Sequence, residues 1–293
     1  MSVIESAIKR ARARNAGKGA PSPNPPARIG EAAQARSSAQ PRPPAPVVVP
    51  AERLQARPIA INRAVCDEQR VLLLEDTTDR NGPAVAAYRI LRTRLLQRAR
   101  LQQWTFIGIT SPSVSDGKSL TALNLALSLS RERNTEVVLL DLDMRNPSIC
   151  RNLGVVPPHH MLEYFEQRIS PAELFFSIGV ERLMLASGTI TTEAASELLG
   201  TGLLSDLKEY IRQRSINPIV LIDLPPLLHT DDALVVAPHI DAMLIVASEG
   251  RTDRLELNKA LEVIGEFPIA GLVLNRGVDT TRPYDYGYGY SRN

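Results

Sequence analysis

Residue types suited to phosphate binding occur at Gly117-Lys118-Ser119, between the apolar run FIGIT (106–110) and a helical pattern. In a loop of this kind the backbone N–H groups hold phosphates, the lysine reaches the β- and γ-phosphate oxygens, and the serine contacts Mg²⁺. The strict form of the motif has glycine at position 112, where this chain has Pro112. The tripeptide alone is therefore a weak signal, and its weight depends on its neighbours.

Acidic residues end two further apolar runs. Asp141 and Asp143 end VVLLDLD, and because side chains alternate along a strand we expect both to point to one face. Asp223 ends IVLID, as a Walker B carboxylate would. Each alone would more often be a turn or helix-capping residue. Together beside a phosphate loop they could coordinate a metal ion, act as a general base, or do one of each.

A cluster of tyrosines ends the sequence. Of seven tyrosines in the chain, four lie in the last ten positions, at Tyr284, Tyr286, Tyr288 and Tyr290. Taken alone, this cluster predicts a disordered aromatic tail. Beside a phosphate loop and three carboxylates it becomes a candidate phosphoryl acceptor, because Gly287 and Gly289 give the backbone freedom to reach a site.

Apolar runs alternate with helical patterns through most of the sequence. The expected strands are 104–110, 136–143, 182–187, 218–224, 242–248 and 270–275. The expected helices are 84–101, 118–131, 193–213 with a break near Gly200–Gly202, and 254–266. This order predicts an α/β fold of the P-loop NTPase type, with a parallel sheet covered by helices on both faces. Such sheets bind ligands at the carboxyl ends of their strands, where all three motifs fall.

Composition predicts four segments. Residues 1–14 form a short amphipathic basic helix with a capping box at Ser2 and Glu5, either a frayed end or a docking element for a partner or an anionic membrane. Residues 15–79 are a mostly disordered Pro/Ala/Arg-rich linker, because they carry too little apolar surface to offset ordering. A P-loop domain follows at 80–281, and 282–293 form a flexible Tyr-rich tail. Residues 1–60 hold ten Lys/Arg and three Glu, so the rest is net acidic under a total charge of +2.

Several functional classes are excluded by composition. The two cysteines, Cys66 and Cys150, have no CxxC spacing and no spaced histidines, which argues against a disulfide framework or a zinc site. No run reaches the roughly 18 apolar residues that span a bilayer, and no secretory signal pattern is visible. We therefore expect a cytoplasmic protein.

The motifs and the tail together resemble the bacterial tyrosine autokinases of capsule and exopolysaccharide biosynthesis. SPSVSDGKS, VVLLDLDMR and IVLIDLPP are similar to that family's Walker A, A′ and B motifs, and LASGTITTEAASELL and LVLNR to later segments. The resemblance covers about residues 80–293, and MSVIESAIKRA also resembles the exosortase-linked subgroup. It implies a P-loop kinase domain at 80–281 that uses ATP and Mg²⁺ to phosphorylate the tail tyrosines in trans. It also implies regulation of exopolysaccharide or capsule polymerisation and export.

The resemblance implies roles for individual residues. Lys118, Asp141 and Asp143 are the catalytic candidates, and a tyrosine hydroxyl with a pKa of roughly 10 needs an acceptor such as Asp141. Which aspartate is base and which is metal ligand stays open. The nucleotide-binding candidates are Ser115, Asp116, Gly117, Lys118, Ser119, Leu120 and Asn275, the last as an adenine contact. The Mg²⁺ candidates are Ser119, Asp143 and Asp223.

Two departures from the family pattern bear on these expectations. Ser115 stands where the family usually has glycine, which puts nucleotide affinity in question. Ala86 replaces the glutamate of a Glu-x-x-Arg-x-x-Arg pattern for ring assembly, so Arg89 and Arg92 remain as candidate oligomer contacts and a ring is in doubt.

Alternatives and partners complete the prediction. The same architecture serves switch ATPases that position division sites or partition chromosomes, but those resemble KGGxGK[ST], and Ser113 replaces the first lysine here. A non-catalytic scaffold of the same fold is a further alternative. The resemblance implies a membrane polysaccharide co-polymerase or chain-length regulator as activator, self-association, and no nucleic acid. Recruitment to the inner face of the membrane would come through that partner or the N-terminal helix.

Overall fold

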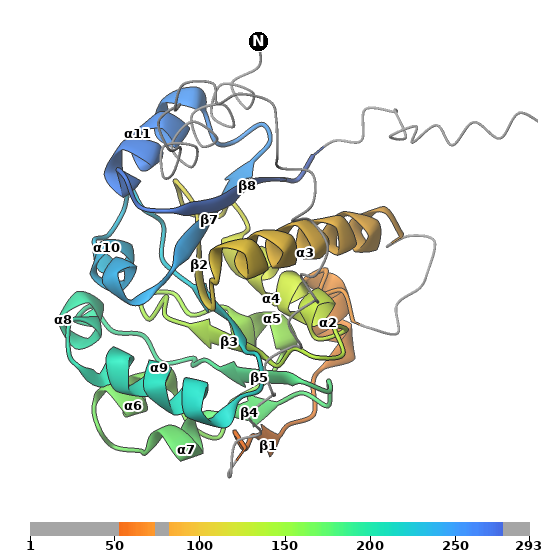
Figure 1. Ribbon diagram of the computed structural model, residues 1–293, viewed down its shortest axis with the longest axis vertical. Helices are drawn as coiled ribbons and strands as arrows, with labels where there is room; N and C mark the ends of the chain where they lie inside the picture. The colour runs from red at the N-terminus through yellow and green to blue at the C-terminus, as the bar shows by residue number, and fades with distance from the viewer. Residues whose placement is uncertain (1–52, 74–81, 278–293) are drawn as a thin grey trace, which may run out of the picture.

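A computed structural model of the chain describes residues 53–73 and 82–277. In this part, eight strands form one sheet in the order β1-β4-β5-β3-β6-β2-β7-β8 (Figure 1). Neighbouring strands run parallel except β4 and β5, which are antiparallel. The strands are β1 (Arg57–Pro58), β2 (Phe106–Thr110), β3 (Val137–Asp141), β4 (Phe176–Ser177), β5 (Leu183–Ala186), β6 (Ile219–Asp223), β7 (Ala242–Ser248) and β8 (Ile269–Asn275).

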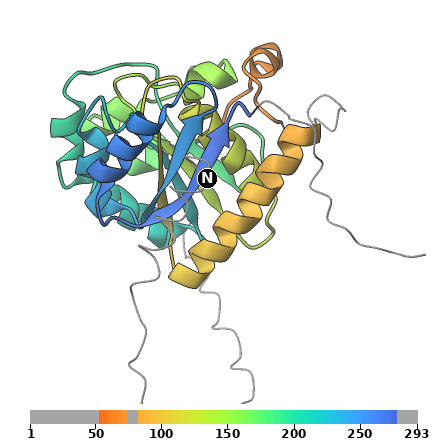
Figure 2. The same cartoon turned by 90° about the horizontal axis from the view of Figure 1, so that it is seen from above.

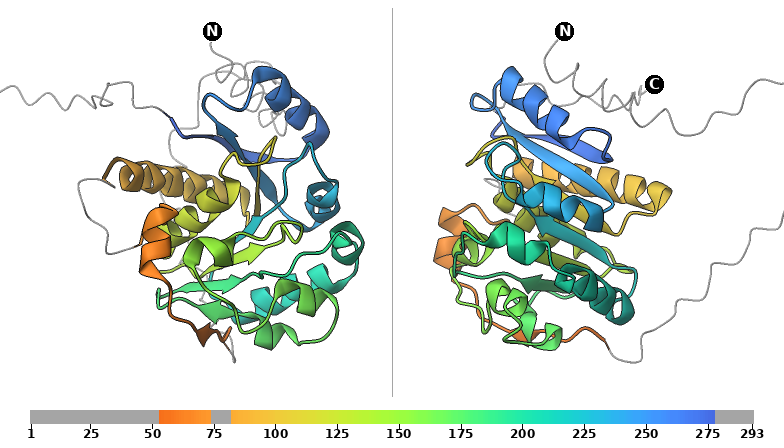
Figure 3. Two further views of the ribbon diagram at one scale, coloured as in Figure 1. Left: turned by 180° about the vertical axis from the view of Figure 1, so that it is seen from behind. Right: turned by 90° about the vertical axis from the view of Figure 1, so that its left-hand side faces the viewer.

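Helices cover both faces of this sheet. One face carries α2 (Arg63–Glu68), α3 (Gly82–Gln102), α4 (Lys118–Leu129) and α5 (Ile149–Leu153). The other carries α6 (Met161–Phe165), α7 (Pro171–Leu174), α8 (Ala195–Leu199), α9 (Leu203–Arg214), α10 (Asp232–Val236), the 3-10 turn η1 (Ala237–His239) and α11 (Arg254–Ile264). Figure 2 shows α3 and α11 on opposite sides of β7 and β8, and Figure 3 shows the layers from two further sides.

Side chains of the central strands alternate between the two helical layers. In β3, Val138 and Leu140 belong to the apolar cluster under α6 to α11, whereas Val137 and Leu139 belong to the cluster under α2 to α5. All five β3 residues are buried, as are all residues of β2, β6 and β7. A strand buried on both faces needs apolar residues at every position, which explains the continuous apolar runs. The predicted fold class is confirmed.

The predicted linker is wrong in its last part. Residues 53–73 pack on the domain: β1 pairs with β4, Leu54 and Val71 are buried, and Cys66 in α2 is fully buried. The Leu72 N–H donates to Asn124 Oδ1 of α4 at 2.8 Å. A few apolar residues are enough to bind a short segment to a preformed surface. Because the preceding residues are rich in proline, the sequence did not distinguish 53–73 from the linker before it. The predicted basic helix at 1–14 and the Tyr-rich tail lie outside the described residues.

Candidate functional site

The three motifs meet at the carboxyl ends of adjacent strands. The sheet order places β6 between β3 and β2, and in register Asp141 pairs with Asp223 while Ile109 pairs with Asp223. The loop 111–117 leaves β2 at the same edge and leads into α4. Carboxylates separated by about 80 positions in sequence therefore lie beside the phosphate loop.

Lys118 is the centre of this arrangement. Its Nζ lies 2.7 Å from Asp143 Oδ2 and 3.2 Å from Asp223 Oδ1, and donates to Ser119 Oγ at 3.1 Å. The lysine side chain is 10% exposed, Asp143 is 5% and Asp223 is 0%. Burial alone would lower the pKa of Lys118, but the charges of Asp223 and Asp143 outweigh it and raise that pKa. The lysine is therefore a buried cation held between two carboxylates.

Asp223 and Asp143 also have the chemistry to hold Mg²⁺. This ion is bound by one or two carboxylates together with phosphate oxygens and water. Asp223 Oδ2 is buried and accepts no hydrogen bond within residues 53–73 and 82–277. In the same residues, no group of three or more His, Cys, Asp or Glu could hold a metal by itself. The orphaned oxygen, the second carboxylate and the Ser119 hydroxyl fit an ion completed by nucleotide phosphates.

Asp141 is held differently from the other two aspartates. Its Oδ2 accepts from the Ser148 and Ile149 N–H groups, both at 3.2 Å, and from Ser187 Oγ at 2.9 Å. Its Oδ1 accepts from the Asp143 N–H at 3.3 Å. Burial and the charge of Asp223 raise the pKa of Asp141 to about 7, and burial likewise raises the pKa of Asp223. Asp141 thus combines a fixed orientation with a pKa near neutrality.

The phosphate loop has the backbone needed to hold an anion. Gly117 has φ +88° as the residue before α4, and a Cβ there would lie 2.1 Å from Asn275 Nδ2. Because the first N–H groups of a helix have no intrahelical acceptor, those of Lys118, Ser119 and Leu120 point toward a ligand position. The Leu120 side chain is partly buried against the apolar cluster, so its backbone N–H is the group offered to a nucleotide.

Contacts from β8, from the segment before α11 and from α11 itself support this loop. Asn275 Nδ2 donates to the Asp116 carbonyl at 2.9 Å, and Thr252 Oγ1 donates to Asp116 Oδ1 at 2.9 Å. Ser113 Oγ donates to Glu256 Oε1 at 2.9 Å. Asn275 is the predicted adenine contact, whereas Thr252 and Glu256 are not among the residues predicted from the sequence. In the structure the Asn275 amide contacts the phosphate loop, and its role toward adenine stays a prediction.

The two arginines proposed as oligomer contacts differ. Arg89 is exposed on α3. Arg92 bonds within the chain instead: its Nη1 donates to the Ser128 carbonyl at 2.9 Å, and its Nε lies 3.2 Å from Glu132 Oε1. Arg92 therefore joins α3 to the end of α4.

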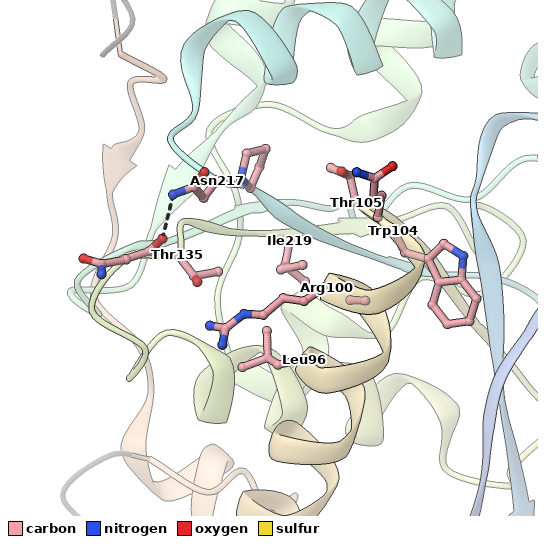
Figure 4. Close-up of a pocket in the computed structure, with 11 residues that line it drawn as sticks. Leu96, Arg100, Trp104, Thr105, Thr135, Asn217 and Ile219 are labelled. Atoms are coloured by element: carbon pink, nitrogen blue, oxygen red, sulfur yellow. Dashed lines mark hydrogen bonds between the residues drawn. The ribbon is translucent and has the colours of Figure 1, made fainter. Parts of the chain in front are cut away.

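A separate hollow of about 410 Å³ lies at the opposite edge of the sheet, beside the amino ends of β2 and β6. Arg100 extends from α3 into it between Leu96 and Ile219 (Figure 4). Ligands of parallel sheets bind at the other edge, so this hollow is not the nucleotide site.

No helix among the described residues is long and apolar enough to cross a bilayer.

The chain is similar to several known tyrosine-protein kinases. Tyrosine-protein kinase YwqD of Bacillus subtilis is 26% identical over 204 residues, covering 69% of this chain and 84% of YwqD. Tyrosine-protein kinase CpsD of Streptococcus agalactiae is 27% identical over 190 residues, covering 62% of this chain and 81% of CpsD. The kinase domain of Escherichia coli tyrosine kinase ETK superposes with a TM-score of 0.63 at 23% identity, covering 80% of this chain and 94% of that one. The predicted resemblance to bacterial tyrosine kinases is confirmed.

The family model for ParA, whose description is "NUBPL iron-transfer P-loop NTPase", matches residues 105–281. The matched region begins just before β2 and contains the phosphate loop and all three aspartates. The chain belongs to the ParA family of P-loop NTPases.

Proposed function

We propose that the chain is an ATP-dependent protein-tyrosine autokinase that phosphorylates its own C-terminal tyrosines in trans. The observation that carries the proposal is Lys118 held between Asp143 and Asp223 beside the phosphate loop, in a chain that has tyrosine-protein kinases as relatives. The four tyrosines near the end supply acceptors that a switch ATPase would not need.

The residues around the phosphate loop take distinct roles in this proposal. Backbone N–H groups at the start of α4, with the helix dipole, bind the phosphates, and Lys118 stabilises negative charge on the transferring phosphoryl group. Ser119, Asp143 and Asp223 would hold Mg²⁺, which supplies further charge neutralisation when bound.

Asp141 is the proposed proton acceptor for the tyrosine hydroxyl. A general base works best when its pKa lies near the operating pH, and that of Asp141 is about 7. Three donors hold Oδ2, whereas Oδ1 accepts one long hydrogen bond among the described residues. The proton would therefore be taken at Oδ1 while Oδ2 fixes the orientation of the carboxylate.

The test is phosphotyrosine mapping by mass spectrometry on the purified full chain with Mg-ATP. We expect phosphate on the tyrosines of 284–290 in the wild-type chain and in the control Lys259→Met, which changes an exposed lysine. We expect no phosphate there in Lys118→Met. ATP hydrolysis without phosphotyrosine, even with an activator, would instead favour the switch ATPase, which the ParA match keeps as the second candidate.

Regulation follows from the resemblance. A membrane polysaccharide co-polymerase would activate the kinase, hold it at the inner face of the cell membrane, and link it to exopolysaccharide or capsule export. Arg89, exposed on α3, is the proposed contact for self-association, and Arg92 would act indirectly by fixing α3 on α4.

A further inference from the structure

The hollow of about 410 Å³ beside the amino ends of β2 and β6 has an apolar surface. Its buried apolar members are Leu96, Ala99 and Ile219, and its half-buried ones are Trp104 and Pro218. This hollow, between the end of α3 and the segments that lead into β2, β3 and β6, is called the edge hollow below. Its size and its lining suit a short apolar peptide segment.

Side chains that donate hydrogen bonds also line the edge hollow. Arg100 extends between Leu96 and Ile219 (Figure 4), and Gln103 and Asn134 contribute amide groups. Among the described residues that line the hollow there is no aspartate or glutamate. An extended or proline-rich segment presents free backbone carbonyl groups to such donors, and apolar grooves with an aromatic residue bind segments of this kind.

The described part of the chain begins beside the edge hollow. Arg53 Nη1 lies 4.0 Å from Glu136 Oε1. Glu136 directly follows the lining residue Thr135, and its Oε2 accepts from the Ile216 N–H at 2.8 Å, one position before the lining residue Asn217. The residues that precede Arg53 in the sequence are therefore connected to the domain next to this hollow.

Those preceding residues include one apolar run. Residues 47–49 are Val-Val-Val between Pro46 and Pro50, and they form the longest run of large apolar side chains in 1–52. Valine favours an extended backbone, and so does the position before a proline. The run stands four to six positions before Arg53. An extended chain of that length spans about 13 to 22 Å, which is enough to reach across the hollow.

We propose that the edge hollow binds residues 46–50 of the same chain. The valine side chains cover the apolar members of the hollow, and Arg100 donates hydrogen bonds to backbone carbonyl groups of the segment. Because the segment is tied to Arg53 by a few residues, its effective concentration at the hollow is on the order of millimolar, and modest affinity is sufficient. The basic residues before 46 then leave the domain at the edge opposite the phosphate loop. The proposal does not depend on the kinase function.

The test uses the tryptophan of the hollow as a reporter in the full chain. Trp104 is the only tryptophan in the sequence, and tryptophan quenches bimane fluorescence on contact. Bimane is attached to the variant Ala45→Cys, directly before Pro46. Cys66 and Cys150 are fully buried and therefore protected from the label. The same labelled chain with Trp104→Phe gives the unquenched reference, and fluorescence lifetimes give the ratio of quenched to unquenched bimane.

Val48→Asp is expected to lower this ratio about tenfold, because burial of one valine side chain contributes at least that factor to a binding equilibrium. The matched control is Val3→Asp, which makes the same change outside 46–50 and should leave the ratio at its wild-type value. Arg100→Ala should lower the ratio about fivefold, as loss of one hydrogen bond does. Arg94→Ala, at an exposed position on the same helix, should not change it.

Equal ratios for Val48→Asp and Val3→Asp would overturn the proposal, and so would a lifetime that Trp104→Phe leaves unchanged. Equal ratios for Arg100→Ala and Arg94→Ala would overturn the part assigned to Arg100. The labelled Trp104→Phe chain is also mixed with unlabelled wild-type chain. Quenching in that mixture would show that the segment of one copy occupies the hollow of another, against binding within one chain. Far-UV circular dichroism of each variant checks the fold, and Val47→Asp replaces Val48→Asp if that variant does not fold.

Discussion

Replacing Lys118 with Met tests the central ion cluster through folding stability, independently of activity. Methionine keeps the length and apolar stem of lysine but removes the charge that faces Asp143 at 2.7 Å and Asp223 at 3.2 Å. The two carboxylates would then remain buried beside each other without a cation.

The size of the effect depends on pH. Breaking a buried ion pair by removing one partner costs about 3–5 kcal/mol, because the other charge is left uncompensated. The aspartates can relieve this cost by binding protons, since burial and a like charge both raise a carboxylate pKa. A carboxylate with a raised folded-state pKa stabilises the fold at low pH and loses that contribution as pH rises. We therefore expect a loss of about 3–5 kcal/mol at pH 8 and about 1–2 kcal/mol at pH 5.

The assay is urea unfolding followed by far-UV circular dichroism on the nucleotide-free chain at pH 5, 6.5 and 8. Wild type is measured at each pH, so that only the difference between variant and wild type is compared. Lys259→Met, on the exposed face of α11, should change stability little at every pH. A difference that is equal at pH 5 and pH 8, or below about 1 kcal/mol at pH 8, would refute the proposed electrostatic role of Lys118.

Asp141, Ser115 and Arg92 each give a further prediction for folding stability. Burial and the charge of Asp223 raise the pKa of Asp141 from 3.8 to about 7. The nucleotide-free wild type should therefore lose unfolding free energy on the order of a few kcal/mol as pH rises from about 4 to 7. Asp141→Asn should flatten this dependence on pH in the same urea denaturation series. Ser115→Gly should stabilise the fold by about 1 kcal/mol in thermal unfolding, because Ser115 has φ +62°, which glycine adopts without strain; an unchanged or lower Tm would contradict this. Arg92→Ala should lower the free energy of unfolding by about 1–3 kcal/mol, because it removes a charged hydrogen bond to the Ser128 carbonyl and the ion pair with Glu132. Arg89→Ala, at an exposed position, should leave the urea midpoint unchanged. Equal midpoints for the two variants would show that Arg92 does not anchor α3.

The central strands could be predicted because burial on both faces requires uninterrupted apolar residues, as in β2, β3, β6 and β7. Strands β1 and β4 have two residues each, which is too short for an alternation of apolar and polar residues to be recognised in the sequence. Likewise α5, α6 and α7 have only four or five residues and depend on tertiary packing. The segment 53–73 escaped prediction for the same reason: its position depends on contacts with residues such as Asn124, far along the chain.

The site residues divide in the same way. Lys118 and the three aspartates could be found because their types and their places at strand ends carry the chemistry. Thr252 and Glu256 could not, since ordinary polar residues acquire a role only when the fold brings them to the loop. The Asp231–Asp232 pair at the start of α10 likewise acquires its contacts only through the fold, since Asp232 bonds to Arg145 and Asp231 to Ser196.

The two unusual positions of the phosphate loop have unequal consequences for nucleotide binding. Ser115 has a left-handed backbone, which costs about 1–3 kcal/mol of conformational free energy for a residue with a side chain. Because its side chain is exposed, it blocks no contact. At Gly117 any Cβ would lie 2.1 Å from Asn275 Nδ2, the same amide that holds the Asp116 carbonyl. A side chain at 117 must therefore displace Asn275 and release the loop, whereas serine at 115 leaves the contacts of the loop intact. The departure from the family pattern at 115 accordingly weakens stability more than it alters the geometry of the anion site.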